Sequence, residues 1–421
     1  MGFRVTINSI LVLLSMMNIK IIAIVLVAIL GVAAVGIYIV TGDEEKSYHP
    51  NTAGQEITDA VGRTVVVPDT LENGIVTIGS SGPLRFLSCF DVFELVIETD
   101  KGDVTDSRNG RAYSYAYPFY NLTEYHADNA LESGTVESIA NKNPSLIVVQ
   151  ESIWTNYGEN CRALATKCTL IVIKSQSMTT MWNDNYDLSK DMQDTFNLLG
   201  TILGKEDRAK ELINGIGGIL KDLRSYIKTS DKNVYIAGVT INGSNTFNTT
   251  FPTYMPLKLI DGNNAYTEPS TESRVTINVE KFATMDIDII AIDPSSSDKM
   301  AESDNQLALE YVYKVNNDGS TANDIKLYVT VPIVWDSINY DCSLASAYYL
   351  TYLLYGGLTH DQVISKINNI FKVFYGNDGS NVLNDMSEFF VKKSSDNNVE
   401  MPILEEVKIV ESGGKYFIMA V

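Results

Sequence analysis

The amino-acid sequence predicts an α/β protein with two α/β units, a long helix between them and one membrane-spanning helix in front. Short runs that are apolar throughout alternate with helical patterns, and such runs are typical of parallel strands covered on both faces. Residues 187–230 keep helical periodicity with a break near 200–205. With 421 residues and 45% apolar content, the chain is long enough for two or three domain-sized units.

The N-terminal region predicts a membrane anchor. Ile21 to Val40 is a run of 20 residues without a charge, which as a helix spans about 30 Å, the thickness of a bilayer core. Arg4 and Lys20 precede it and acidic residues follow, so the remainder of the chain is expected outside the cytoplasm. A cleaved signal peptide is the alternative, but the run is longer than the apolar core of such peptides, which favours a retained single-pass anchor in the cell membrane.

The first α/β unit follows a hairpin pattern at 57–70. A short strand is expected at 75–78, then a helical pattern with a strand at its end over 83–97. Helix and strand patterns alternate again at 137–150 and at 157–175. This alternation predicts a parallel sheet.

The alternation restarts after the long helical region, with strands expected at 233–240, 286–293 and 325–332. Helical patterns occupy 343–357 and 361–376, and a small strand pair is expected after Glu400. The resulting division of the chain is an anchor over 1–41, a tether over 42–55, a first lobe over 56–204, an inter-lobe helix over 205–229, a second lobe with helices over 230–395, and a C-terminal extension over 396–421.

Composition excludes several functional classes. The net charge of −20 disfavours a nucleic-acid-binding protein, which would need a basic face. The cysteines are compatible with disulfides outside the cell, although three pairings are open, and they are Cys89, Cys161, Cys168 and Cys342. Three histidines and no C-x-x-C argue against a zinc or haem site built from Cys and His.

The loop Gly79-Ser80-Ser81-Gly82-Pro83 between a strand and a helix raises the possibility of an enzyme. It does not have the G-x-S-x-G spacing of a nucleophile elbow, and it does not have the lysine of a phosphate loop. A tight turn with Pro83 at the first helical position is the simpler interpretation. We therefore expect no enzymatic activity and no resident cofactor.

Loops rich in aromatic residues follow the predicted strands. They are 111–126, 244–256 and 331–341. Aromatic side chains at strand ends suit a flat, partly polar ligand, because they offer ring faces together with hydroxyl groups. Packing of these loops on the core is the alternative for each residue.

Several segments together resemble the solute-binding proteins of ABC importers for iron–siderophore, haem and corrinoid (cobalamin-type) complexes, particularly archaeal members. The resemblance extends from Ile57 to Gly376, and Ser145 departs from it where the family usually has aspartate. The segments that carry it are 57–87, with D-A-V-G-R-T-V before the first strand, 136–149 (VESIANKNPSLIVV), 203–216 (LGKEDRAKELINGI), 245–266 (NTFNTTFPTYMPLKLIDGNNAY) and 345–376.

The resemblance implies two Rossmann-like lobes joined by one long helix, with the ligand between the carboxyl ends of their strands. The positions then predicted to line the cleft are Ser80, Ser81, Arg85, Tyr115, Tyr117 and Trp154 in the first lobe, and Phe247, Thr249, Tyr254, Trp335 and Tyr340 in the second. The Arg85 guanidinium suits a pair of ligand oxygens, and a salt bridge to Asp91 is the alternative.

Two glutamates take the places that dock on permease arginines in this family. Glu137 lies in TVESIA and Glu280 in NVEKFA, and each could equally be an acid that favours a helix N-terminus. The implied partners are an ABC permease with its ATPase and a metal-chelate ligand, and a monomer is expected. An extracellular ligand sensor or surface module on the same fold is the alternative function.

Overall fold

The computed structural model describes residues 54–104, 110–174, 181–239, 247–270, 274–296, 300, 303–319, 324–335, 337–396 and 399–421. The predicted membrane anchor and nearly all of the tether lie outside these residues. In the part of the chain that is described, no helix is both long and apolar enough to cross a bilayer.

The first sheet has five strands in the order β5-β4-β3-β6-β7, and all of its pairings are parallel. The strands are β3 (Ile75–Ile78), β4 (Val96–Asp100), β5 (Tyr125–His126), β6 (Leu146–Gln150) and β7 (Leu170–Ile173). The helices of this region are α3 (Pro83–Leu87), α4 (Tyr113–Ala116), α5 (Ser133–Lys142), α6 (Glu151–Asn156) and α7 (Gly158–Ala165). The predicted parallel sheet is confirmed.

Both faces of this sheet are buried. In β6, Leu146 and Val148 belong to the main core, whereas Ile147 and Val149 belong to a second core with residues of α5 and α7. Because side chains alternate between the faces of a strand, a strand covered on both faces must be apolar at every position. This explains the continuous apolar runs in the sequence.

Two helices follow the first sheet and fit the predicted break. They are α8 (Lys190–Ile202) and α9 (Glu206–Arg224), which is 19 residues long. Arg208 of α9 donates hydrogen bonds to the carbonyl of Cys89, near α3, and to those of Val373 and Phe374 at the end of a C-terminal helix. The long helix is thus bonded at one position to both halves of the chain.

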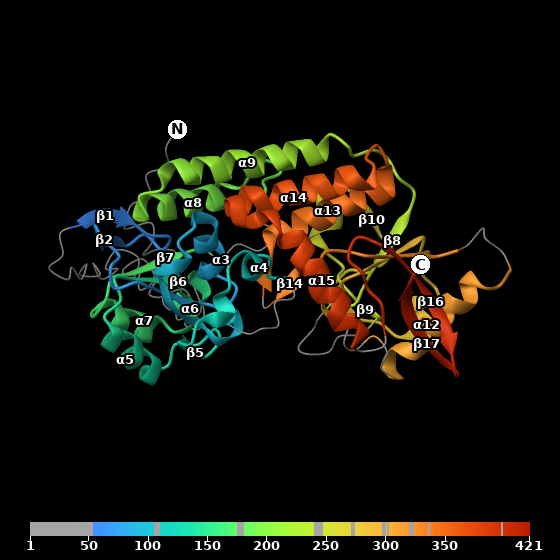
Figure 1. The fold of residues 1–421 in the computed structure, drawn as a ribbon, viewed down its shortest axis with the longest axis horizontal. Coiled ribbons are helices and arrows are strands. Elements are labelled where there is room, and N and C mark those ends of the chain that lie inside the picture. Colours follow the sequence, from blue (N-terminus) through green and yellow to red (C-terminus); the bar gives the residue numbers. More distant parts are fainter. Residues whose placement is uncertain are drawn as a thin grey trace, which may run out of the picture. The chain divides into compact units, whose positions relative to one another are not determined.

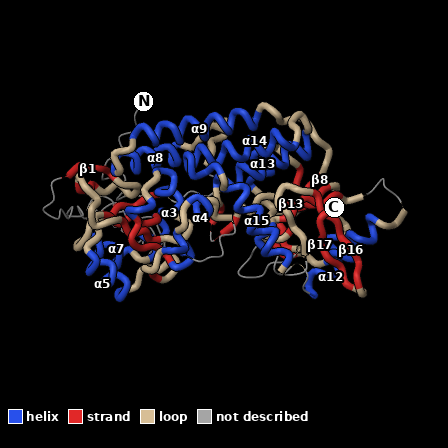
Figure 2. The backbone as a smooth tube through the Cα atoms, viewed as in Figure 1, coloured by secondary structure: helices blue, strands red, loops and turns tan. Residues whose placement is uncertain are grey.

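The second sheet has the order β10-β8-β12-β13-β16-β17. Its strands are β8 (Asn233–Ala237), β10 (Asn263–Asn264), β12 (Ile289–Ile292), β13 (Lys326–Val329), β16 (Glu406–Ser412) and β17 (Lys415–Ala420). The first four are parallel, and β16 and β17 add an antiparallel hairpin next to β13 (Figure 2). The strand pair expected near the C-terminus is therefore present, and it continues the sheet of the second lobe.

Three small antiparallel strand pairs and six further α-helices are also described. The strand pairs are β1–β2 (Gly54–Thr58, Thr64–Pro68), β9–β11 (Thr249–Thr250, Val275–Thr276) and β14–β15 (Val334–Trp335, Ser337–Ile338). The helices are α10 (Met255–Leu259), α11 (Val279–Phe282), α12 (Ser303–Asn316), α13 (Tyr340–Tyr355), α14 (His360–Tyr375) and α15 (Val382–Ser395). Thr359 and Gln362 form a capping box at the start of α14. Helices α9, α13 and α14 pack against one another (Figure 1).

The four cysteines form no disulfides. All are buried free thiols, and burial raises the pKa of Cys89 to about 12 and that of Cys161 to about 11. Cys161 lies on α7 and faces the second core, while Cys168 follows the helix. The cysteines serve as small apolar core residues, so the disulfides considered from the sequence are not present.

His126 fastens the edge strand β5 to β4. Its Nδ1 lies 3.1 Å from Glu98 Oε1 and its Nε2 lies 3.3 Å from Asp100 Oδ2, and Lys142 Nζ bonds the other oxygen of Glu98 at 2.8 Å. Burial alone would lower the pKa of the imidazole. The hydrogen bonds and charges of Asp100 and Glu98 outweigh burial and raise the pKa of His126 to about 9.

This clamp makes stability depend on pH. The folded protein holds the His126 proton up to a pKa of about 9, whereas the unfolded chain releases it near 6.5. The stabilisation is therefore complete below pH 6.5 and is lost as the pH rises to about 9, which corresponds to about 3 kcal/mol of unfolding free energy. Urea unfolding at pH 6.5 and 9.5 should show this loss in the wild type and in His360→Gln, but not in His126→Gln. An equal loss in all three proteins would contradict the clamp.

Candidate functional site

The loop that follows β3 lies at the carboxyl edge of the first sheet, where open α/β sheets bind their ligands. Three successive backbone amides of this loop donate to side-chain oxygens. Gly79 N donates to Asp100 Oδ2 (2.7 Å), Ser80 N to Asn129 Oδ1 (3.0 Å) and Ser81 N to Asp103 Oδ1 (3.2 Å). The loop is therefore held by the strand-end segments next to it.

Asp103 is the centre of a buried polar cluster. It accepts hydrogen bonds from the Tyr113 hydroxyl (2.7 Å) and from Ser81 N, and Arg111 Nη1 lies 3.9 Å from it. The Ser81 hydroxyl is 3.2 Å from the Tyr113 hydroxyl. Burial raises the pKa of Asp103 to about 6, against the opposing charge of Arg111. This cluster fixes Ser81 in a left-handed conformation with φ of 52°.

Gly79 and Gly82 allow the loop backbone to lie close to Gln150, and they do not form a binding site for a ligand. A Cβ at Gly79 would lie 2.6 Å from Gln150 Cβ, and one at Gly82 would lie 2.1 Å from Gln150 Oε1. Gly79 also has a φ of 121°, a backbone conformation that residues with a side chain rarely adopt. The two glycines thus let the loop pack against the end of β6.

These contacts argue against an anion site at the loop amides and against Ser81 as a nucleophile. An anion or oxyanion site needs backbone amides that point at the ligand, and the three loop amides are already bonded to protein oxygens. A nucleophilic serine needs an adjacent base, and the Ser81 hydroxyl instead contacts a tyrosine. The loop is a buried structural turn, with Ser80 3% exposed and Ser81 fully buried.

Arg85 and Tyr340 are predicted cleft residues that the structure brings together. Arg85 Nη1 donates to the carbonyl of Ile338 at 2.5 Å, and its guanidinium carbon lies 4.2 Å from the centre of the Tyr340 ring. The contact joins α3 to the segment between β15 and α13. Arg85 makes no ion pair with Asp91, so the alternative role considered for it is wrong.

The predicted tyrosines of the loop 111–126 also face the second half of the chain. The ring centre of Tyr117 lies 6.4 Å from that of Tyr375 on α14, and the ring centre of Tyr115 lies 6.0 Å from that of Phe389 on α15. Tyr117 is 5% exposed. These two aromatic residues pack helices together, as the alternative interpretation of the loop proposed.

Trp154 lies elsewhere, at an open recess of about 640 Å³ between α6 and α7. Arg63 stacks over its ring at 4.1 Å from the ring centre. Asn156, Tyr157 and Arg162 also line the recess. Trp154 is therefore separated from the contact between Arg85 and Tyr340.

The second-lobe positions are mostly internal. Phe247, Thr249 and Tyr254 are at most 1% exposed, and Phe247 N donates to Asn305 Oδ1 at 2.5 Å. Trp335 belongs to β14, but its side chain lies outside the described residues. Asp293, just after β12, bonds the amides of Ser295 and Ile333 in the way that Asp100 bonds the first-lobe loop.

The two predicted docking glutamates are both exposed. Glu280 is in the first turn of α11, where the helix dipole favours an acid. Glu137 is the fifth residue of α5 and lies past the first turn, so the helix dipole favours an acid less at this position than at Glu280. Neither makes an ion pair with another described residue.

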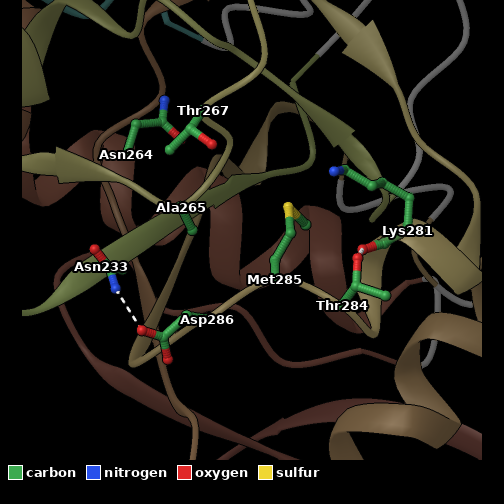
Figure 3. A pocket seen from close by; sticks show the side chains of 8 residues that line it. All are labelled: Asn233, Asn264, Ala265, Thr267, Lys281, Thr284, Met285 and Asp286. Atoms are coloured by element: carbon green, nitrogen blue, oxygen red, sulfur yellow. Dashed lines mark hydrogen bonds between the residues drawn. The ribbon is translucent and has the colours of Figure 1, made fainter.

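A pocket of about 210 Å³ lies beside Asn233, at the amino end of β8 (Figure 3). Several of its polar groups are bonded within the protein: Asn233 Nδ2 donates to Asp286 Oδ2 (3.0 Å), Lys281 pairs with Glu268 (2.6 Å), and Asn264 Nδ2 donates to two backbone carbonyls. This pocket offers a ligand few open hydrogen-bonding partners. Among the described residues, no group of three or more His, Cys, Asp or Glu side chains is placed to hold a metal ion.

The side chains that hold the loop were not foreseen from the sequence. Asp100, Asp103 and Asn129 each bond one of its amides, and Tyr113 and Arg111 complete the cluster. The acids that end the run VIETDKGD were a possible signal, since polar residues directly after a buried strand meet at the sheet edge.

Residues 109–313 match the family model of the periplasmic binding proteins. A search of curated proteins gave no match. Among solved structures, a periplasmic solute-binding protein from Veillonella parvula is 14% identical, with a TM-score of 0.54 over 78% of this chain and 96% of that one.

Two further structures are similar in fold. An ABC transporter solute-binding protein from Sulfurospirillum deleyianum is 14% identical, with a TM-score of 0.51 over 77% of this chain and 98% of that one. A molybdate periplasmic binding protein of a Haemophilus influenzae ABC transporter is 13% identical, with a TM-score of 0.51 over 76% and 98%. The family model thus covers a little under half of this chain, and the two-sheet fold described above is similar to that of these solute-binding proteins.

Proposed function

We propose that this chain is an extracytoplasmic solute-binding protein that captures a metal chelate, such as a siderophore complex, haem or a corrinoid, and delivers it to an ABC permease. The observation that carries the proposal is the family match over residues 109–313, which includes parts of both sheets. The ligand would bind between the lobes, at the carboxyl ends of their strands.

Binding without chemistry is the role that the strand-end loops support. The serine loop has its amides bonded to Asp100, Asn129 and Asp103, so it offers neither an oxyanion hole nor an activated nucleophile. Arg85 and Tyr340 are the residues we assign to the ligand side of the two lobes. A cation with aromatic neighbours suits an anionic chelate with planar oxygen donors.

We assign residues 1–41 to a single-pass anchor that keeps the protein at the outer face of the cell membrane. The uncharged run Ile21–Val40 and the basic residues before it support this assignment. The lobes over 56–204 and 230–395, with the helix over 205–229 between them, would then act outside the cytoplasm as a monomer.

The ligand assignment is tested by native mass spectrometry of the full-length protein, purified in detergent from its own host. A co-purifying iron, cobalt or haem complex, released on denaturation, supports the chelate assignment. A bare oxyanion such as molybdate, or a ligand with no metal, would redirect it to another class of solute.

Docking is tested by reversing both exposed glutamates. Because an arginine on the permease would meet an arginine instead of a carboxylate, Glu137→Arg with Glu280→Arg should abolish uptake of the chelate into cells. The affinity of the purified variant for the chelate should stay within about twofold of wild type, since both residues lie on outer helices.

The matched control is Glu132→Arg with Glu388→Arg, which reverses two other exposed acids, one at the N-cap of α5 and one on α15, and should leave uptake unchanged. Uptake that survives in the Glu137 and Glu280 variant would refute the docking role. A parallel loss of ligand affinity would assign the defect to folding.

A further inference from the structure

Arg85 is a buried cation with no anionic partner among the described residues. Arg85 is 3% exposed. The nearby buried acid Asp341 does not pair with it, because Asp341 accepts hydrogen bonds from the Tyr375 hydroxyl and from the amide of Cys342. Buried charges in proteins are normally paired, because desolvation of an unpaired charge costs several kcal/mol. That no carboxylate of the described residues pairs with Arg85 therefore calls for an explanation.

Neutral groups of the second lobe lie where a carboxylate would otherwise pair with Arg85. The carbonyl oxygen of Ile338 accepts from Nη1 at 2.5 Å, the Tyr340 hydroxyl lies 3.4 Å from Nη2, and the Tyr340 ring covers the guanidinium. The Nε of Arg85 is buried without any hydrogen-bond partner. One of the donor groups that form the planar fork of the guanidinium is thus unused.

An anionic oxygen would bind this guanidinium more strongly than the carbonyl does. The bond to the carbonyl is already strengthened by the charge of the guanidinium, but an anionic oxygen adds the attraction between opposite charges, and a planar oxygen pair can engage Nε and an Nη together. The Ile338 carbonyl belongs to β15, whose two residues pair with the two residues of β14, and the next residue, Asn339, donates its amide to the Ile333 carbonyl (2.8 Å). A segment held by this small number of backbone bonds can be displaced at lower cost than a strand of the main sheets.

We propose that the Ile338 carbonyl and Tyr340 occupy the position beside Arg85 at which an anion can bind, and we call these two groups the occupant. When the ligand binds, one of its anionic oxygens replaces the occupant at Arg85. In the ligand-free protein the occupant holds α3 against the start of α13 and compensates the buried charge. On binding, the ligand displaces the carbonyl and the contact between these segments opens. This inference rests on the proposed solute-binding function and adds to it that the preferred ligand carries negative charge.

The contact itself is tested without any ligand, by amide hydrogen exchange of the full-length protein in detergent. Arg85→Gln should raise exchange in the segment 337–343 at least tenfold, because the guanidinium no longer holds the Ile338 carbonyl. Arg63→Gln, which removes an arginine stacked on Trp154 in the same lobe, is the matched control and should leave 337–343 unchanged. Unchanged exchange in Arg85→Gln overturns the proposal.

Competition is tested with two probes, the anionic ferric tris-catecholate of 2,3-dihydroxybenzoate and the neutral ferric tris-acetohydroxamate. Tyr340→Leu weakens the occupant and leaves Arg85 in place, so it should bind the anionic complex at least fivefold more tightly than wild type. The neutral complex has no anionic oxygen to replace the occupant at Arg85, so it should show no such gain in affinity. Tyr352→Leu, a half-buried tyrosine on the same helix, is the control and should behave as wild type.

The outcomes separate this inference from the function on which it rests. Equal or weaker binding of the anionic complex by Tyr340→Leu, with wild type binding it, overturns the competition and leaves the solute-binding function standing. Arg85→Lys, which keeps the charge, should retain more of the anionic affinity than Arg85→Gln, and equal losses would make Arg85 a packing residue. Failure of every variant to bind either complex counts against the chelate function and removes the ligand part of the inference.

Discussion

The carboxyl edges of both sheets depend on buried aspartates that bond backbone amides in neighbouring segments. Asp100 and Asp103 hold the loop after β3, Asp293 ties Ser295 to Ile333, and Asp59 joins the turn of the first hairpin to Val172 of β7. Loops at strand ends carry amides that no strand partner satisfies, and a buried amide without a partner costs free energy. The aspartates satisfy those amides and fix the edge on which a ligand would act.

This constraint changes which groups are available for recognition. A loop whose amides are all bonded cannot itself receive an anion, so positive charge at the edge must come from a side chain. Arg85 provides it one turn into α3, and it reaches the second lobe instead of an acid. Tyr117 packs on Tyr375 and Tyr115 packs on Phe389, so these aromatic residues also join the two halves of the chain.

Much of the fold could be predicted because it follows from local periodicity. The fully apolar runs of β6, β7 and β12 predicted buried parallel strands, and the break near 200–205 predicted two helices where α8 and α9 lie. The candidate site was harder to predict, because it depends on distance in space. Trp154 and Arg85 are both in strand-end segments, yet Trp154 borders a recess on the outside of α6 and α7. The cysteines likewise proved to be free, since spacing along the chain does not fix the separation of thiols.

The sequence by itself determined the α/β class, the parallel strands, the long helix and the resemblance to solute-binding proteins, because each is written in residue type and short-range spacing. Only the tertiary structure decided the role of the serine loop and of Arg85. Their partners, Asp103 and Tyr113 for Ser81 and Ile338 and Tyr340 for Arg85, lie from 22 to 255 residues away in the chain. Whether a polar side chain faces a ligand or another part of the protein is settled by such long-range contacts, which no local pattern encodes.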